Sequence, residues 1–330
     1  MIPLLAALLA AVLAAPGGTT EDGPPLSATA PSLAASLSCP SSSGPRPAGR
    51  GGRTRPAGRG GRTQPESVLL VHGTGSNSAE SWSWNYLRAL PELGFVVCTV
   101  DLPDRSLGDI QVATEYVVYA VREMAARFGR PVDVIGHSQG GLEARWALRW
   151  WPGLRRLVDD DVSLGTPNHG TSDADWYCRG RRSCPPAVQQ LRTDSRFLAA
   201  LNQGDETPGD VSYTTVASLD DEVVRPVQSP ALVGAVNVVV QDLCPGRPVH
   251  HAGFLHDAAT FAVVLDALTR PGPADPRAFD PAVCTAPWMP GVLEPFTGNV
   301  MFYGNSAVAL FGYRDNVGAE PPVAPYAGGR

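Results

Sequence analysis

The sequence contains no lysine, so all 26 of its basic residues are arginine, and 32 acidic residues give a net charge of −6. A chain of negative net charge, with only 18% charged residues, is not expected to bind nucleic acid generally. The longest apolar run, residues 2–15, is shorter than the roughly 20 residues of a membrane-spanning helix. No Cys-x-x-Cys pair indicates a zinc or redox site. These absences predict a protein without a transmembrane segment or a metal site.

Hydrophobic residues make up 43% of the chain, which is enough for a sizeable core. The apolar run ends in small residues, as the apolar part of a secretory signal does, and predicts a signal peptide over residues 1–15. An even number of cysteines in an exported chain favours disulfides, and six cysteines allow 15 pairings. The cysteines are Cys39, Cys98, Cys178, Cys184, Cys244 and Cys284. The sequence therefore predicts a secreted, disulfide-bonded protein.

Residues 16–65 are rich in Gly, Pro, Ser, Thr and Ala, and they include a nonamer, residues 46–54, that recurs as residues 55–63. This composition favours a solvated linker. The alternative is that the arginines of the repeat bind an anionic surface. Residues 66–330 then form one large α/β domain.

Strand-like and helix-like patterns alternate along this domain. Strands are predicted at 68–71, 95–100, 132–135, 158–164, 211–217 and 235–240, and helices at 110–128, 139–151 and 257–268. Such alternation predicts a mostly parallel sheet with helices on both faces. Residues 171–209 carry little strand signal and are predicted to be a lid-like insertion, while no element is predicted beyond residue 271.

Residues 136–140, Gly-His-Ser-Gln-Gly, match the Gly-x-Ser-x-Gly nucleophile elbow between a predicted strand and a predicted helix. On this sharp turn the hydroxyl of Ser138 is exposed above the sheet, at the N-terminus of the following helix. Ser138 is therefore the predicted nucleophile. An oxyanion would be bound by the backbone N–H of Gln139 and by the loop after the first strand, where Thr74 lies.

A serine nucleophile needs a histidine base and an orienting carboxylate, in the chain order Ser, Asp or Glu, His. By that order the base is among His250, His251 and His256. The carboxylate is expected in the loop after residues 211–217, which offers Asp220 and Asp221. Asp242 and Asp257 are weaker choices, as helix caps or solvated groups.

Four stretches resemble the lipase B family of secreted α/β-hydrolases, typified by the lipase of Candida antarctica, and related bacterial triacylglycerol lipases. They are residues 68–75 (VLLVHGTG), 111–117 (QVATEYV), 138–142 (SQGGL) and 251–253 (HAG). The resemblance covers about residues 66–290. It implies an α/β-hydrolase fold, a serine triad, and hydrolysis of carboxylic esters, including triacylglycerols, without a metal or other cofactor.

Residue by residue, the resemblance selects Asp221 as the acid and His251 as the base, and it makes Thr74 and Gln139 the oxyanion pair. It also implies that three cysteine pairs form: Cys39 with Cys98, Cys178 with Cys184, and Cys244 with Cys284. His137 departs from the family's lipase B, which has a tryptophan before the serine. Residues 165–171 instead resemble bacterial lipases.

The function expected from the sequence is a secreted serine ester hydrolase, most simply a lipase that acts on a lipid or other ester at an oil–water interface. A carboxylesterase or polyester hydrolase would use the same triad, as would an acyltransferase that transfers the acyl group to an alcohol or sugar. A different class of function is a non-catalytic surface protein that binds through the arginine repeat. The sequence carries no prediction of oligomeric state.

Overall fold

The computed structural model describes residues 22–40 and 66–328. The predicted signal peptide, residues 1–15, and the nonamer repeat lie outside the described residues. Within residues 22–40 and 66–328, no helix is both long and apolar enough to cross a membrane.

A seven-stranded sheet forms the centre of the domain, in the order β1-β3-β2-β4-β5-β6-β7. The strands are β1 (Leu37–Ser38), β2 (Ser67–Val71), β3 (Val96–Val100), β4 (Val132–His137), β5 (Val158–Leu164), β6 (Ser212–Ala217) and β7 (Val236–Val239). All neighbours are parallel except β1, which pairs antiparallel with β3. The predicted mostly parallel sheet is therefore confirmed. Each predicted strand is present, with bounds that differ by at most two residues.

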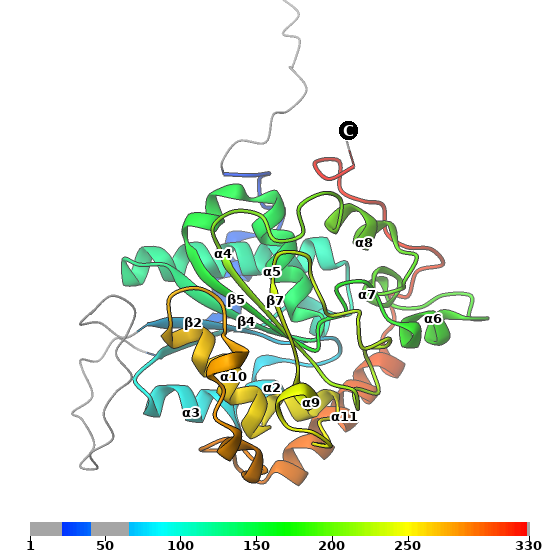
Figure 1. The fold of residues 1–330 in the computed structure, drawn as a ribbon. Coiled ribbons are helices and arrows are strands. Elements are labelled where there is room, and N and C mark those ends of the chain that lie inside the picture. Colours follow the sequence, from blue (N-terminus) through cyan, green and yellow to red (C-terminus); the bar gives the residue numbers. More distant parts are fainter. Residues whose placement is uncertain (1–21, 41–65, 329–330) are drawn as a thin grey trace, which may run out of the picture.

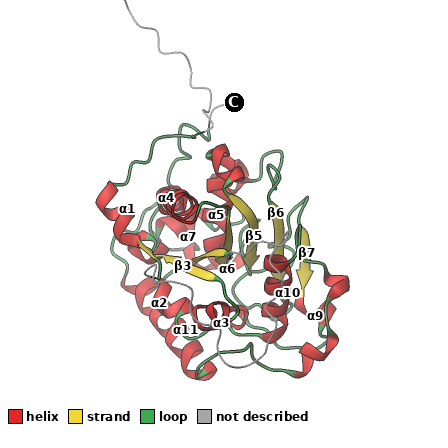
Figure 2. Cartoon of the chain, turned by 90° about the vertical axis from the view of Figure 1, so that its left-hand side faces the viewer, coloured by secondary structure: helices red, strands yellow, loops and turns green. Residues whose placement is uncertain are grey.

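Helices cover both faces of the sheet (Figures 1 and 2). In β2, Leu69 and Val71 pack into one buried core, whereas Val68 and Leu70 pack into the other. The first core includes α4 (Ile110–Phe128) and α5 (Gly140–Trp150), and the second includes α3 (Tyr86–Glu92) and α10 (Ala258–Thr269). Burial on both faces explains why the strands read as continuous apolar runs rather than as alternating patterns.

Shorter elements complete the described part of the chain. They are α1 (Ala30–Ser36), α2 (Ser78–Trp82), η2 (Pro103–Ser106), η3 (Pro152–Arg156), α6 (Ser172–Cys178), α7 (Pro186–Gln190), α8 (Arg196–Leu201), α9 (Val240–Leu243), η4 (His251–Leu255), η5 (Pro276–Ala278), η6 (Pro281–Thr285) and α11 (Pro295–Gly312). The predicted insertion, residues 171–209, contains α6, α7 and α8. Phe197 and Leu201 of α8 are buried in the same core as α5, so this segment is packed against the domain.

The prediction that residues 16–65 form a linker is wrong for residues 22–40, which pack on the domain. The backbone N–H groups of Ser27 and Ala28 donate to Glu115 of α4, and the indole of Trp151 donates to the carbonyl of Pro24. Cys39 is bonded to Cys98 of β3. Leu33 of this segment is buried, and Leu26 and Leu37 pack against the first core, but these few apolar residues are too sparse for the sequence pattern to indicate structure.

Helix α11 was not foreseen, because no element was expected beyond residue 271. It contains Gly298 and Gly304, which disfavour helix. Many of its apolar side chains are exposed, including Phe296 and Phe311, so no single apolar stripe marks its buried face. Its contacts with α2 and with η4 hold it beside the sheet (Figure 1).

Three disulfides join Cys39 to Cys98, Cys178 to Cys184, and Cys244 to Cys284. These are the pairs that the family resemblance implies. Among the described residues no cysteine is free.

Candidate active site

Ser138 lies on the turn between β4 and α5, with a backbone φ of 55° that non-glycine residues rarely adopt. Two glycines make this turn possible. A Cβ atom at Gly136 would lie 2.5 Å from the Cα of Gly141, and one at Gly140 would lie 2.4 Å from the carbonyl oxygen of Val71. The residues two before and two after Ser138 must therefore be glycine, as the nucleophile elbow requires.

Asp221 and His251 form a buried hydrogen-bonded pair. The His251 Nδ1 atom lies 3.0 Å from Oδ2 and 3.1 Å from Oδ1 of Asp221. Asp221 follows β6 in a loop, where its Oδ1 also accepts the backbone N–H groups of Val223 and Val224, at 2.8 and 2.9 Å. Because an ionised carboxylate only accepts hydrogen bonds, the Nδ1 atom of His251 carries the proton and donates it, which leaves its Nε2 atom free to accept one.

The charges in this pair stabilise each other. Burial by itself would raise the pKa of Asp221, but the charge of His251 and the hydrogen bonds from His251, Val224 and Val223 outweigh it and lower that pKa. Burial likewise opposes protonation of His251, yet the carboxylate of Asp221 raises the pKa of the imidazole above its usual value. The pair is therefore suited to hold an imidazolium while a reaction proceeds.

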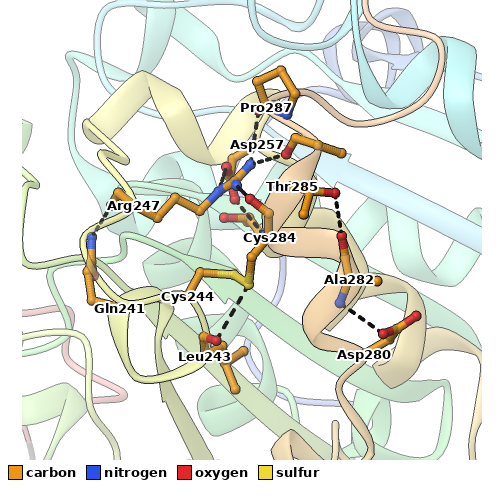
Figure 3. Close-up of a disulfide and its surroundings, with 12 residues drawn as sticks. Gln241, Leu243, Cys244, Arg247, Asp257, Asp280, Ala282, Cys284, Thr285 and Pro287 are labelled. Carbon is orange, nitrogen blue, oxygen red and sulfur yellow. Dashed lines mark hydrogen bonds and ion pairs between the residues drawn. A yellow bond between two sulfur atoms is a disulfide. The ribbon is translucent and has the colours of Figure 1, made fainter.

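Residues on either side of His251 in the chain are anchored, and Figure 3 shows the disulfide of Cys244 with Cys284 and the contact of Arg247 with Asp257. The disulfide between Cys244 and Cys284 holds the chain at the end of α9. The buried guanidinium of Arg247 forms an ion pair with Asp257 and donates to the carbonyl of Cys284 at 3.0 Å. Cys244 and Arg247 precede His251 in the chain, and Asp257 follows it. The contacts therefore fix the chain on both sides of His251, and they tie it to Cys284 in η6.

His137 connects the Asp–His pair to the serine. Its Nε2 atom lies 3.1 Å from the carbonyl oxygen of His251, and the two imidazole rings lie 4.9 Å apart between centroids. Since a carbonyl only accepts, Nε2 of His137 carries the proton. Burial, together with the neighbouring His251, lowers the pKa of His137 to about 3. His137 is thus a neutral residue that contacts His251 and directly precedes Ser138 in the chain.

Thr74 contacts Gln139, the residue that follows Ser138. The Oγ1 atom of Thr74 donates to Oε1 of Gln139 at 2.5 Å. The loop that carries Thr74 is close to the serine, because a Cβ atom at Gly73 would lie 2.7 Å from the Cβ of Ser138. Ser138 therefore stands between a residue that touches His251 and one that touches Thr74.

The other sequence candidates lie elsewhere. Asp220 and His250 are exposed, and the Nδ1 atom of His250 faces the backbone carbonyl of Asp220 at 3.2 Å. His256 interacts with Asn299 of α11, and Asp257 is the partner of Arg247. In the described ranges no group of three or more His, Cys, Asp or Glu could hold a metal ion.

Several neighbours of the site were missed by sequence reasoning. Glu222 accepts the backbone N–H of His251 at 3.1 Å and the hydroxyl of Tyr303, which in turn accepts the N–H of Ala252 at 3.0 Å. Arg105 donates twice to the carbonyl of Gly75, at 2.7 and 3.0 Å. Glu222 could have been found from the sequence, because it directly follows the predicted acid, Asp221. Tyr303 could not be found, because α11 was not predicted.

The chain is similar to known lipases, although no family model matches it. Lipase B of Pseudozyma antarctica is 30% identical over 272 residues, which are 79% of this chain and 78% of that protein. The crystal structure of Aspergillus fumigatus lipase B has a TM-score of 0.79 at 27% identity, covering 95% of this chain and 77% of that one.

A more distant similarity supports the fold alone. The mature form of Bacillus licheniformis lipase BlEst2 has a TM-score of 0.50 at 21% identity and covers 63% of this chain and 94% of that one. Together with the sheet order, these similarities confirm the α/β-hydrolase fold and the resemblance drawn from the sequence. The chain belongs to the lipase B family of α/β-hydrolases, and it is a carboxylic ester hydrolase.

Proposed function

We propose that the protein is a secreted lipase that cleaves acylglycerols or related esters through Ser138, His251 and Asp221. The observation that carries this proposal is the buried hydrogen bond between Asp221 and His251, next to the strained turn of Ser138. No other histidine of the described residues forms a buried pair with a carboxylate. His169 pairs with Glu206 and His250 with Glu222, but both of these histidines are exposed.

In the reaction, Nε2 of His251 takes the proton of Ser138 as the serine oxygen attacks the ester carbonyl. The negative charge that develops on the carbonyl oxygen is stabilised by the backbone N–H groups of Thr74 and Gln139. Asp221 holds the imidazolium. His251 then protonates the leaving alcohol, and water, activated by the same imidazole, releases the fatty acid from the acyl-enzyme.

The proposal of secretion rests on two features. The apolar residues 2–15 have the character of a signal peptide, and three disulfides suit an oxidising compartment. N-terminal sequencing of protein recovered from the culture medium tests it. Retention of residues 1–15, or recovery only from inside the cell, would contradict it.

The triad is tested with matched neighbours as controls. Ser138→Ala and His251→Ala are each expected to reduce kcat on p-nitrophenyl butyrate by about 10⁶-fold, and Asp221→Asn by about 10⁴-fold, because the residues act as a unit. His250→Ala and Asp220→Asn change adjacent, exposed groups and are expected to retain activity within about threefold. Undiminished hydrolysis by Ser138→Ala would overturn the proposal.

The substrate class is tested with p-nitrophenyl esters of increasing chain length, below and above their solubility limits. A lipase is expected to gain activity on long chains above the limit, where an interface exists. Saturation on short soluble esters would indicate a carboxylesterase instead. Product analysis with and without an added alcohol separates hydrolysis from acyl transfer.

A further inference from the structure

Glu143 is a fully buried carboxyl group directly behind the proposed oxyanion hole. It lies in the first turn of α5, four residues after Gln139, and its side chain has no contact with solvent. Its Oε1 atom accepts the Nε2 of Gln139 at 2.7 Å. Gln139 in turn accepts the hydroxyl of Thr74 through Oε1 at 2.5 Å. The three side chains therefore form one continuous series of hydrogen bonds.

The direction of this series is set at Glu143. A glutamine side chain has a donor end and an acceptor end of nearly equal size, so one partner decides which end faces which neighbour. With the acid proton on Oε2, the Oε1 atom of Glu143 is a carbonyl oxygen that accepts, and it therefore holds Nε2 of Gln139 toward itself. Oε1 of Gln139 is then turned toward Thr74 and accepts the proton of its hydroxyl, which ties the Thr74 loop to the residue after the serine.

Glu143 does this without bringing a negative charge to the site. Burial raises its pKa to about 8, although the hydrogen bond from Gln139 opposes that rise. Its Oε2 atom is buried, and it has no hydrogen-bond partner in the described part of the chain. A single hydrogen bond is too little to support a buried carboxylate, so the acid is neutral near pH 7. A neutral group does not repel the oxyanion that the site must stabilise.

We propose that Glu143 is a positioning residue for ester hydrolysis, which fixes the amide of Gln139 and, through the hydrogen bond that this amide accepts from the Thr74 hydroxyl, the Thr74 backbone N–H that faces the oxyanion. This rests on the proposed function of Ser138 and its oxyanion hole. No step of the reaction passes through Glu143 itself, since it does not touch the reacting atoms.

The first test removes the acceptor and keeps the volume. Glu143→Met is expected to lower kcat on p-nitrophenyl butyrate by about tenfold with little change in KM, less than the ~10²–10³-fold loss when an oxyanion donor is deleted. Glu143→Gln retains an acceptor oxygen and is expected to restore most of that loss. Leu148→Val serves as the control, because it perturbs the buried side of α5 away from the site and is expected to keep kcat. Wild-type kcat in Glu143→Met would overturn the proposal.

The second test is a double-mutant cycle with Thr74→Val, which removes the hydroxyl and keeps the shape. If Glu143 acts through Thr74, then Glu143→Met is expected to lower kcat less than twofold in the Thr74→Val background. An equal loss in both backgrounds would show a merely structural role. Should Glu143→Met fail to fold, Glu143→Leu replaces it in the same cycle.

The outcome also separates this inference from the function on which it rests. Loss of activity in Ser138→Ala together with an unaffected Glu143→Met refutes only the positioning role. Retained activity in Ser138→Ala refutes both.

Discussion

Replacing Glu143 with glutamine is expected to stabilise the protein, by an amount that grows with pH. The folded protein holds a proton on Glu143 up to about pH 8, whereas the unfolded chain releases it near the ordinary value of 4.5. Between these values unfolding releases a proton, so the free energy of unfolding falls by about 1.4 kcal/mol for each pH unit. The wild type is therefore most stable, with respect to this group, below pH 4.5 and loses that stability as the pH rises toward 8.

The magnitude follows from the same two pKa values. From pH 4.5 to pH 7 the loss is about 3 kcal/mol, a large part of the stability of an ordinary domain. Glutamine keeps the volume and the acceptor oxygen but has no proton to release. Between pH 4 and pH 7, the free energy of unfolding of Glu143→Gln is thus expected to rise by about 3 kcal/mol relative to that of the wild type.

Urea unfolding of both proteins at unit steps from pH 4 to pH 8 measures this difference. Asp161 is also buried, and its pKa is raised to about 7, so the stability of each protein alone will vary with pH for more than one reason. That contribution is common to both proteins and cancels in the comparison. Glu123→Gln, at an exposed position of α4, is the matched control and is expected to show no such gain. A stability difference that stays constant from pH 4 to pH 8 would refute the reasoning, because it would mean that Glu143 is ionised in the folded protein.

The remaining predictions concern the base, its loop and the disulfides. The charge of Glu222 raises the pKa of His251, so Glu222→Gln is expected to move the acid limb of the kcat/KM profile to lower pH; an unmoved limb would contradict the base assignment. Tyr303→Phe removes the hydrogen bonds that Tyr303 of α11 makes with Ala252 and Glu222, next to His251 and Asp221 in the chain. It is expected to lower kcat several-fold, with circular dichroism as the check on folding. Replacing the cysteines of each disulfide by serine is expected to cost about 2 kcal/mol for Cys178–Cys184, which closes a loop of six residues. The cost is about 4 kcal/mol for Cys39–Cys98 and Cys244–Cys284, at separations of 59 and 40, as measured by urea unfolding. Equal losses for all three would exclude loop closure as the cause.

The parts of the fold that were predictable are those in which local pattern and burial agree. The strand at 68–71 is buried, as its apolar run predicts. The helix at 110–128 buries one face along its length, as its helical spacing of apolar residues predicts. The elbow at Ser138 was predictable because its glycines are dictated by contacts within a few residues and with the neighbouring strand.

The missed parts depend on contacts that no local pattern encodes. Helix α11 contains several glycines and is partly exposed, so its sequence shows neither a helical preference nor an apolar stripe. It contacts η4 and α2, which lie far away in the sequence. The role of Glu143 is equally invisible, since a glutamate in the first turn of a helix ordinarily indicates a favourable dipole interaction at the surface. The structure supplies what the sequence does not: the side chain of Glu143 is fully buried, which raises its pKa, and it accepts a hydrogen bond from Gln139.

The attachment of residues 22–40 has a consequence for any proteolytic processing of this enzyme. A single cut between residues 41 and 65 would separate the polypeptide into two chains. The covalent link from Cys39 to Cys98 and the antiparallel pairing of β1 with β3 would still join them. Such a nicked enzyme would migrate as one species until a reductant is added, and its sheet edge would stay covered. Cleavage there would therefore neither release the N-terminal piece nor expose a free strand for aggregation.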